Sequence, residues 1–401
     1  MSERPKIVLA FSGGLDTTYC AVHLAREMGA DVYTATVNTG GFTAEECDAI
    51  EARALALGAV GHRTIDATRE FYTRCIRYLV YGNVLRGGVY PLSVSAERVF
   101  QAEAIARHAR ELGATHVAHG STGAGNDQVR FDSVFHILLP GVPILTPIRD
   151  HGLSRDEEIA RLRAHGVEGQ WERAPYSINQ GLWGTSVGGR ETLGSTEPLP
   201  EEAWPVPVTR DDSETVELRF ERGEIVDVNA RGCSDSIEAI RALERIAAPF
   251  GVGRDIHIGD TIIGMKGRVG FAAAAPLIII KAHHALEKHT LTRQQQLVKE
   301  QLAAVYGGLV HEAQFLDPAA RDIEALFERS QRHVTGTVRV RLAPYRFHIL
   351  GVDTPHDLMA SRFGAYGEEQ RGWTGDDVRG FSRIHANQAM IHHAVHDGED
   401  A

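Results

Sequence analysis

Residues 10–18, AFSGGLDTT, join a short apolar run to two glycines and a carboxylate, a combination that can bind an anion. We interpret Ile7 to Ala10 as a buried strand and Leu15 to Glu27 as a helix, with Ser12-Gly13-Gly14 as the turn between them. Glycines let main-chain N–H groups approach a ligand closely. The N-terminus of the helix adds unpaired donors and the positive end of its dipole, which together favour a phosphate.

Asp16 lies on the first turn of that helix, where its carboxylate would cap the helix or hold a cation that bridges to phosphate oxygens. The loop differs from the Walker pattern because no lysine follows the glycines, and it lacks the glycine spacing of the dinucleotide-binding fingerprint. A plain glycine-rich turn between strand and helix is the alternative, since such turns are common. The loop alone therefore predicts a phosphate site without identifying the ligand.

A second polar set lies in the sequence GSTGAGNDQVRF, residues 120–131, directly after a predicted strand. It places uncharged donors, a carboxylate and a guanidinium close together, at Thr122, Asn126, Asp127, Gln128 and Arg130. Recognition of a zwitterionic amino acid requires groups of these kinds. A polar surface loop built on an Asn-Asp turn is the alternative for this segment alone. Its presence beside the Ser-Gly-Gly-x-Asp loop in one domain favours a substrate site.

The elements that must position these residues alternate between strand and helix. Beyond the first strand and helix, we expect strands at 32–37, 62–65, 116–119 and 142–146, and helices at 44–57, 97–112 and 154–165. Such alternation predicts a parallel sheet with crossover helices, so the fold class is α/β. In these sheets ligands bind beyond the carboxyl ends of the strands, where the glycine loop lies. We expect this nucleotide-binding domain to span residues 1–166.

Residues 167–365 are predicted to form a second domain, of the α+β type. Residues 176–200 are rich in Gly, Ser and Thr with few periodic apolar positions, and we interpret them as a long functional segment. Beyond it we expect hairpins at 215–228 and 337–352, and helices at 236–248, 275–288, 293–306 and 318–332. The tail, residues 366–401, carries a short amphipathic helix at 384–395, which would pack on another subunit or lie in solvent.

The composition argues against several function classes. With 401 residues, of which 43% are hydrophobic, the chain can form two domains with proper cores. MSERPK precedes the first strand without an apolar signal segment, and no run approaches a membrane span, so we expect a cytoplasmic protein without a membrane partner. A formal charge of −11 argues against nucleic acid as a partner. The cysteines have no CxxC spacing, so we expect reduced, buried thiols at Cys20, Cys47, Cys75 and Cys233.

The loop at residues 10–18 resembles the SGGxDS pyrophosphate-binding loop of the ATP pyrophosphatases, with Thr17 and Thr18 at the hydroxyl positions. The chain as a whole is similar to the argininosuccinate synthase family. The motifs that carry this similarity follow the family's order over nearly the whole length: AFSGGLDTT, YPLSVSAERV, HGSTGAGNDQVRF, PYSINQGLWGTS, GVGR and IIGMKGR. The resemblance implies a Rossmann-like (adenine nucleotide alpha hydrolase-like) domain, a synthetase/multimerisation domain and a C-terminal oligomerisation helix.

The same resemblance implies which residues form the site. ATP would be bound by Ala10, Phe11, Ser12, Gly13, Gly14, Leu15, Asp16, Thr17, Thr18, Val37 and Gly120. Citrulline would be bound by Tyr90, Ser95, Asn126, Arg130, Ser177 and Ser186, and aspartate by Thr122, Asn126 and Asp127. The residues implied to carry the catalysis are Asp16, Asn126, Asp127 and Arg130, and no metal ligand is assigned to the protein.

The activity that the resemblance implies is the ATP-dependent condensation of citrulline with aspartate, which gives argininosuccinate, AMP and pyrophosphate in arginine biosynthesis. The ureido oxygen of citrulline would attack the α phosphate, and the amino group of aspartate would then displace AMP. ATP and Mg²⁺ are the expected cofactors, small-molecule substrates are the expected partners, and the expected assembly is a homotetramer. No protein nucleophile is needed, so positioning and charge stabilisation would supply the catalysis.

Several positions depart from the family's pattern. Ala124 stands where the family has Lys, and Val94 where it has Thr. Gly259 stands where the family has a citrulline-binding Glu, and Phe271 stands where it has a Tyr. Residues 179–181 replace a triplet that is more acidic in the family. These changes remove negative charge from the site that should receive an α-ammonium group. Two hypotheses follow: a divergent subfamily binds the same citrulline through rearranged contacts, or the acceptor is an N-acylated citrulline.

Other interpretations stay open from the sequence. Another enzyme of the same loop superfamily, such as a tRNA thiolase or an amidotransferase synthetase, would need reactive cysteines, a basic RNA surface or a nucleophilic cysteine domain, and none is visible. A nucleotide-binding sensor without turnover would not need the polar set at 122–130. The histidines lack the spacing of a metal site, so we expect core or solvated side chains at 283, 284, 289, 385, 392, 393 and 396.

Overall fold

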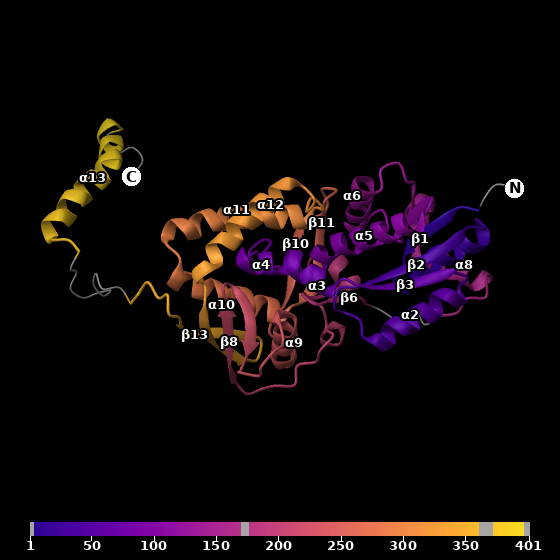
Figure 1. Ribbon diagram of the computed structural model, residues 1–401, viewed down its shortest axis with the longest axis horizontal. Coiled ribbons are helices and arrows are strands. Elements are labelled where there is room, and N and C mark those ends of the chain that lie inside the picture. Colours follow the sequence, from indigo (N-terminus) through magenta and orange to yellow (C-terminus); the bar gives the residue numbers. More distant parts are fainter. Residues whose placement is uncertain (1–3, 170–175, 361–371, 397–401) are drawn as a thin grey trace.

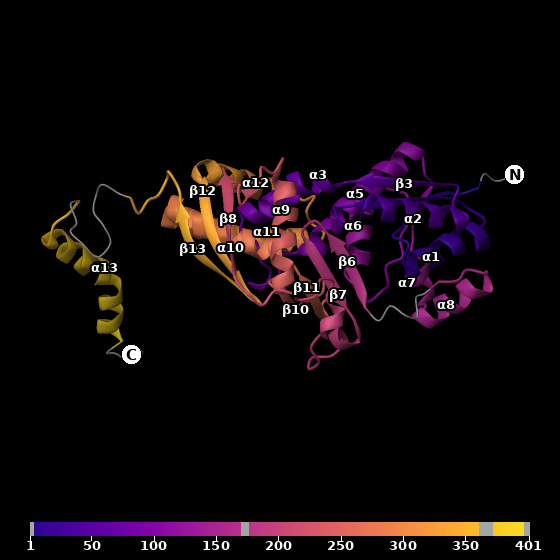
Figure 2. The same cartoon turned by 90° about the horizontal axis from the view of Figure 1, so that it is seen from below.

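The computed structural model describes residues 4–169, 176–360 and 372–396. It has a parallel sheet near the N-terminus, two antiparallel sheets that follow it, and one terminal helix that lies apart from these (Figure 1). The sheet β10-β11-β7-β6 lies between the parallel sheet and the sheet β13-β12-β8-β9 along the long axis of the molecule (Figure 2). The α/β class predicted from the alternating pattern is confirmed.

The parallel sheet has five strands in the order β3-β2-β1-β4-β5. Their bounds are β1 (Lys6–Ala10), β2 (Asp31–Asn38), β3 (Gly61–Asp66), β4 (His116–Ala118) and β5 (Ile144–Leu145). The strand order reverses between β1 and β4. The loops that follow these two strands therefore flank the crevice in which such sheets bind ligands.

Successive residues of β1 point to opposite faces of the sheet and enter two different cores. Val8 packs in the core that α5 covers, whereas Ile7 and Leu9 pack in the core beneath α1 and α8. All three side chains are fully buried, which explains why the strand reads as a continuous apolar run rather than an alternating one.

Helices cover both faces of this sheet, and the short π-helical segments η1 and η2 extend two of them. Their bounds are α1 (Leu15–Val22), η1 (His23–Glu27), α2 (Ala44–Ala56), α3 (Thr68–Phe71), η2 (Tyr72–Ile76), α4 (Arg77–Tyr81), α5 (Ser93–Leu112), α6 (Asp127–Leu138), α7 (Pro147–His151) and α8 (Arg155–Ala164). Capping boxes start α2 at Thr43 and α8 at Ser154. Gly113, with a φ of 64°, ends α5 in the left-handed conformation that favours glycine.

The remaining elements build the antiparallel sheets and their helices. The strands are β6 (Ser177–Gly181), β7 (Gly184–Gly188), β8 (Glu214–Glu221), β9 (Glu224–Val228), β10 (Arg254–Asp260), β11 (Lys266–Ala272), β12 (Gly336–Ala343) and β13 (Arg346–Asp353). The helices are η4 (Arg190–Leu193), η5 (Glu201–Ala203), α9 (Ser236–Ala247), η6 (Ala248–Phe250), α10 (Ala274–Thr290), α11 (Arg293–His311), α12 (Pro318–Ser330), η7 (Gln331–His333) and α13 (Gly375–Val395).

Two hairpins of this part differ in how well the sequence predicts them. The β8–β9 hairpin turns at Arg222 and Gly223, whose φ angles of 48° and 83° fit the tight turn that the sequence predicts there. Residues 176–200, interpreted as a long functional segment, contain the unpredicted hairpin β6–β7. Each strand has one aliphatic residue, Ile178 or Val187, among Ser, Asn, Gln, Thr and Gly, so neither strand shows an apolar alternation.

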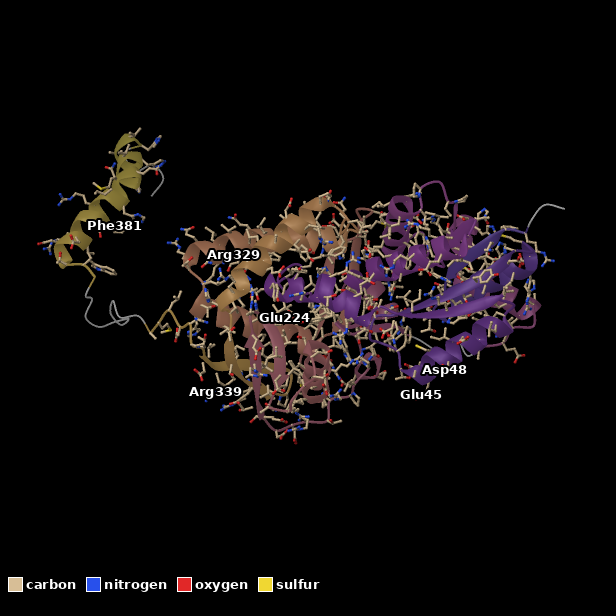
Figure 3. All side chains as sticks on the ribbon, viewed as in Figure 1. Glu45, Asp48, Glu224, Arg329, Arg339 and Phe381 are labelled. Atoms are coloured by element: carbon tan, nitrogen blue, oxygen red, sulfur yellow. The ribbon has the colours of Figure 1, made fainter. Side chains whose placement is uncertain are left out.

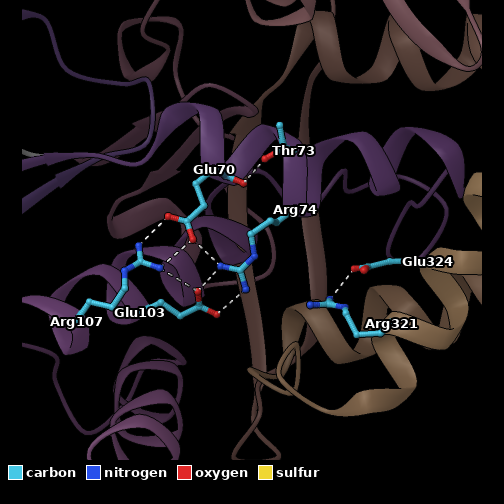
Figure 4. A network of polar contacts seen from close by, with 7 residues as sticks. All are labelled: Glu70, Thr73, Arg74, Glu103, Arg107, Arg321 and Glu324. Atoms are coloured by element: carbon cyan, nitrogen blue, oxygen red, sulfur yellow. Dashed lines mark hydrogen bonds and ion pairs between the residues drawn. The ribbon is translucent and has the colours of Figure 1, made fainter. Parts of the chain in front are cut away.

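An ion-pair network fixes α5 against the segment α3–η2 (Figure 4). Arg107 donates its two terminal nitrogens to the two oxygens of Glu70, at 2.9 and 2.7 Å. Arg74 donates to Glu70 at 2.6 Å and to Glu103 at 2.5 Å. Glu103 is only 4% exposed, so its charge depends on these guanidinium partners. The network thereby holds α5, which carries several candidate site residues near its N-terminus.

A second polar network is fully buried where α10, α11 and η7 meet the end of α4. Glu287 accepts hydrogen bonds from Lys299 Nζ at 2.6 Å, from Asn83 Nδ2 at 2.6 Å and from Gln331 Nε2 at 2.9 Å. The oxygens of the two amides then face the ring nitrogens of His283, at 2.7 and 2.8 Å. His283 is therefore a core side chain, as the sequence predicts.

Helix α13 begins nine residues earlier than the sequence predicts, because Thr374 and Asp377 form a capping box before its polar first turns. None of its residues is buried, and Phe381 lies on it away from the rest of the molecule (Figure 3). Among the residues that the structure describes, no helix combines the length and the apolar content needed to cross a membrane.

We expect Lys299→Met to lower the free energy of unfolding by about 3 to 5 kcal/mol, because it leaves the Glu287 carboxylate buried without its cation. Lys288→Met, on the exposed face of α10, removes the same type of side chain without breaking a buried pair and should change stability by less than about 0.5 kcal/mol. Urea unfolding of both variants measures the difference. Equal losses in the two variants would show that the buried pair does not govern stability.

Candidate functional site

The glycine loop lies at the carboxyl end of β1, beside the crevice between β1 and β4. Gly13 has a φ of 75°, which favours glycine, and Gly14 precedes α1 in an extended conformation without a side-chain cap. The first turn of α1 therefore keeps main-chain N–H groups that have no partner within the helix. Ser12 N–H donates to Thr17 Oγ1 at 3.3 Å, and the Thr17 hydroxyl donates to the Gly14 carbonyl at 3.4 Å. These two bonds hold the loop in shape.

Gly120 lies just after β4, across the crevice from β1, and approaches the glycine loop closely. A Cβ atom at Gly120 would lie 3.2 Å from the main chain of Asp16 and of Thr17. Any larger residue at this position would push the two loops apart. The structure thus brings the predicted ATP residues 10–18, Val37 and Gly120 to one edge of the sheet, although Thr18 is fully buried and its hydroxyl has no hydrogen-bond partner.

Asp16, on α1, shares its surroundings with Glu158, which α8 contributes. Burial raises the pKa of Asp16, although a main-chain hydrogen bond and the charge of Arg155 oppose the shift. Burial and the charge of Asp16 raise the pKa of Glu158 to about 8. Glu158 is 3% exposed, and its Oε2 has no hydrogen-bond partner. At neutral pH the Glu158 carboxyl group is therefore mostly protonated. The sequence did not identify Glu158 as a site residue, because it lies in the acidic first turn of α8, where carboxylates are usually exposed to solvent.

Asp127 lies between two guanidinium groups. Its Oδ2 accepts from Arg98 Nε at 2.9 Å, and its Oδ1 accepts from Arg130 Nη1 at 2.9 Å. Burial disfavours the ionised form, but the charges of Arg98 and Arg130 outweigh it and lower the pKa of Asp127 to about 2. Asp127, predicted to face an ammonium group of aspartate, already makes two charge-assisted hydrogen bonds within the protein.

The two arginines extend from Asp127 to the second half of the chain. Arg98 Nη2 donates to Asn179 Oδ1 on β6 at 2.9 Å, and Arg130 Nε donates to the His311 carbonyl at the end of α11 at 3.1 Å. One carboxylate thus connects α5, α6, β6 and α11. Sequence reasoning missed Arg98, although a Glu-Arg pair within the small and apolar run SVSAERV was a signal that these charges have buried partners.

The remaining predicted aspartate residues lie around the start of α6. Asn126 Oδ1 accepts the main-chain N–H of Ile262 at 2.8 Å, which ties the turn between β10 and β11 to this site. Thr122 is exposed in the loop that precedes α6. The predicted set for aspartate therefore lines one short segment, and Asn126 also contacts the antiparallel half of the chain.

The predicted citrulline residues come from three elements. Ser95 is buried in the first turn of α5, where its hydroxyl donates to the Leu92 carbonyl at 3.2 Å. Ser186 is buried on β7, directly across from Asn179 on β6, whereas Ser177 is exposed at the start of β6. We call Asp127, Arg98 and Arg130 the Asp127 cluster. Ser186 is the cross-strand neighbour of Asn179, which accepts a hydrogen bond from Arg98 of this cluster, whereas Ser177 lies at its margin.

Tyr90 packs in a group of rings that we call the aromatic wall, made of Tyr90, His257 and Phe271. The His257 ring stacks on Tyr90 with centroids 5.0 Å apart and an angle of 19°, and Phe271 lies 5.2 Å from Tyr90. Tyr90 and Phe271 are 4% and 0% exposed, so these rings are part of the hydrophobic core. Sequence reasoning missed His257, because nothing in the local pattern of β10 distinguishes an inward histidine from an exposed one.

A parallel sheet with a reversal of strand order, and a glycine loop that opens a helix at that reversal, defines a nucleotide-binding α/β protein. The family model described as "Arginosuccinate synthase N-terminal HUP domain" matches residues 6–168. The model described as "Arginosuccinate synthase C-terminal domain" matches residues 176–392. The chain belongs to the argininosuccinate synthase family, as its motifs predict.

Curated relatives agree with this assignment over nearly the whole chain. The argininosuccinate synthase of Methanocaldococcus jannaschii is 36% identical over 388 residues, which cover 96% of this chain and 97% of that protein. The argininosuccinate synthase of Xanthomonas campestris is 35% identical, with 97% of this chain and 98% of that protein covered. The argininosuccinate synthase of Sulfolobus acidocaldarius is 33% identical, with 96% and 98% covered.

We expect the carboxyl group of Glu158 to make the folded protein less stable as pH rises. Its pKa of about 8 in the folded state lies above the ordinary value, so between about pH 4.5 and pH 8 the folded protein binds the proton more tightly than the unfolded chain does. The free energy of unfolding then falls with rising pH by at most about 1.4 kcal/mol per pH unit from this group.

Glu158→Gln should therefore flatten the dependence of stability on pH between pH 5 and pH 8. Asp156→Asn, on the exposed face of the same helix, is the matched control and should keep the wild-type slope. Urea unfolding at a series of pH values measures both slopes. An unchanged slope in Glu158→Gln would contradict the raised pKa.

Proposed function

We propose that this chain is an argininosuccinate synthase, which condenses a ureido amino acid with aspartate, uses ATP, and releases AMP and pyrophosphate. The observation that carries the proposal is the close approach of Gly120, in the segment that leads to Asp127, to Asp16 and Thr17 beside the glycine loop. This approach supports a phosphate site next to a site of amino-acid-binding groups. Family membership supports a ligase that forms a carbon–nitrogen bond and a place in arginine biosynthesis.

Each substrate has a proposed set of contacts in this arrangement. The phosphates of ATP lie against residues 10–18, with Val37 and Gly120 beside the nucleotide. Aspartate is bound by Thr122, Asn126 and Asp127. The ureido substrate is bound by Tyr90, Ser95, Asn126, Arg130, Ser177 and Ser186. The proposed domain limits are 1–166 for the nucleotide-binding domain, 167–365 for the synthetase domain and 366–401 for the tail.

The reaction proceeds in two displacement steps. In the first, the ureido oxygen attacks the α phosphorus of ATP, the bond to the β-phosphate oxygen breaks, and pyrophosphate leaves toward the main-chain donors of the glycine loop. In the second, the amino nitrogen of aspartate attacks the ureido carbon, and AMP leaves with the former ureido oxygen while the amine loses its proton to solvent. The protein holds the reacting groups and balances their charge.

Mg²⁺ would bind at this site together with the phosphates of ATP. Asp16 is the side chain that would hold it, since hard cations take carboxylate oxygens and Asp16 lies at the first turn of α1. Among the described residues, no three His, Cys, Asp or Glu side chains form a metal-binding group. The remaining ligands would be phosphate oxygens and water, and the ion would neutralise the charge of the departing pyrophosphate.

We expect AMP and pyrophosphate to form in equal amounts when the protein receives ATP, a ureido acceptor and aspartate. Multiple turnovers should stop when either amino-acid substrate is left out. Asp16→Asn should lower kcat/KM for ATP by about 10²-fold or more, because it removes the carboxylate that would hold Mg²⁺ beside the phosphates. Asp48→Asn, on the exposed face of α2, is the control and should be unaffected (Figure 3).

A coupled pyrophosphate assay with quantification of AMP measures these rates. Steady AMP release without aspartate would contradict the proposal, since a ligase of this kind cannot turn over without its second substrate.

We also propose that the protein is a cytoplasmic homotetramer in which α13 packs on another subunit. Phe381, Ile384, Ile391 and Val395 follow the three- and four-residue spacing of one helix face, and each is more than half exposed. Such a stripe is normally covered in a stable assembly. The four cysteines are free, which suits a reducing compartment.

Sedimentation velocity tests the assembly. The wild-type chain should sediment as a tetramer, and the double variant Phe381→Asp with Ile384→Asp should dissociate, because it places charges in the stripe. Ser382→Asp adds a charge beside the stripe and should leave the tetramer intact. A wild-type monomer, or a double variant that stays tetrameric, would overturn the role given to α13.

A further inference from the structure

Glu97 is a buried carboxylate that no step of the proposed reaction uses. It lies near the start of α5 and is 1% exposed. Its Oε2 accepts a hydrogen bond from the Thr39 hydroxyl at 2.7 Å, and its Oε1 accepts one from Arg98 Nη1 at 3.1 Å. Burial raises the pKa of Glu97 to about 7, although the charge of Arg98 and the Thr39 hydroxyl oppose the shift. A carboxyl group is costly to bury, so its two oxygens depend on these partners.

Thr39 belongs to the segment between β2 and α2, residues 39–42, which we call the β2 loop. Asn38, the last residue of β2, holds this loop in shape, because its Oδ1 accepts two main-chain N–H groups of the loop at 2.8 and 3.2 Å. Val37, proposed to lie beside the nucleotide, precedes Asn38 directly. Strand β2 is paired with β1, which the glycine loop follows. The β2 loop therefore lies at the edge of the sheet where the nucleotide would bind.

The β6–β7 hairpin contacts the β2 loop from the antiparallel half of the chain. Leu182 N–H, in the turn of this hairpin, donates to the Thr39 carbonyl at 3.1 Å. Gly181 lies directly against the carboxylate, since a Cβ atom at this position would collide with Glu97 Oε2. Glu97 thus lies where α5, the β2 loop and the hairpin meet.

Arg98 connects Glu97 to the Asp127 cluster. Its guanidinium group donates to Glu97 through Nη1 and to Asp127 through Nε, at 3.1 and 2.9 Å. Together with the Thr39 hydroxyl, these contacts join the β2 loop to the residues proposed to bind aspartate. Thr39, Glu97 and Arg98 are 2%, 1% and 9% exposed, so water has little access to these contacts. Buried polar contacts whose partners are all present make a structure rigid.

We propose that Glu97 is a positioning residue, which holds the β2 loop in place beside the nucleotide and ties it to the Asp127 cluster. The proposal rests on the proposed function, since it concerns the same ATP site. The carboxylate acts through the Thr39 hydroxyl and touches no substrate. Without this hydrogen bond the β2 loop is held less firmly, and the nucleotide must order it on binding, which lowers its affinity. The aspartate site keeps its own contacts when the Thr39 hydroxyl alone is lost.

Calorimetric titration of the full chain with α,β-methylene-ATP and Mg²⁺ tests this contact. Thr39→Val removes the hydroxyl and keeps the shape of the side chain, whereas Glu97→Ala removes the acceptor. Each should raise the dissociation constant of the nucleotide about fivefold or more. The double variant should bind no more weakly than Glu97→Ala, because both changes remove the same hydrogen bond. Thr39→Ser keeps the hydroxyl and should bind within about twofold of the wild type.

Thr34→Val is the matched control for loss of a buried hydroxyl. Thr34 is fully buried on the same strand, and its hydroxyl forms a hydrogen bond with His62 Nδ1 at 2.8 Å. This variant should lower stability and leave the dissociation constant within about twofold of the wild type. In steady-state kinetics, Thr39→Val should raise KM for ATP about fivefold and leave KM for aspartate unchanged. A purely structural role would lower the free energy of unfolding and change neither KM.

The outcomes separate this inference from the proposed function. Unchanged nucleotide affinity in Thr39→Val and Glu97→Ala, or an equal loss of affinity in Thr34→Val, would overturn the inference and leave the proposed function intact. A wild-type chain that binds no nucleotide would overturn the proposed function and this inference with it.

Discussion

The ion pairs of Asp127 with Arg98 and Arg130 are the contact on which the rest of the site depends. Both arginines are nearly buried, and a buried guanidinium group without a counter-charge is costly, so the carboxylate must remain ionised and in place. Through Arg98 it positions β6, and through Arg130 it positions the end of α11. The parallel and antiparallel halves of the chain thus meet around one cluster of ion pairs. Mutation of Asp127 would remove the partner that the two arginines share and would disturb both halves.

Around that centre, the chain divides the chemistry between two kinds of surface. The glycine loop offers main-chain donors to phosphate, and its geometry follows from Gly13, Gly14 and the close approach of Gly120. The opposite side contains the buried rings of Tyr90, His257 and Phe271. A ligase that activates its acceptor by adenylation needs no protein nucleophile, which explains why the important side chains serve to position groups and balance charge. Membership of the family sets the reaction class.

The sequence was sufficient for elements whose own residues determine them. The apolar run of β1 and the Arg222-Gly223 turn are local signals, and each predicted its element. The hairpin β6–β7 was missed because its residues are mostly small and polar and show no apolar alternation. Arg98, His257 and Glu158 were missed because their roles come from partners far away in the chain. The predicted phosphate and amino-acid residues, by contrast, belong to contiguous motifs.

The fate of the ureido oxygen tests the account most directly. If the acceptor is activated at the glycine loop as proposed, an acceptor labelled with ¹⁸O in its ureido group should transfer that oxygen to the phosphate of AMP in every turnover. Mass spectrometry of the AMP formed in the presence of aspartate measures the transfer. We expect one labelled oxygen for each AMP molecule. Unlabelled AMP formed in unlabelled water, with the label retained in the ureido compound, would show that ATP is cleaved by water and would contradict the adenylating mechanism.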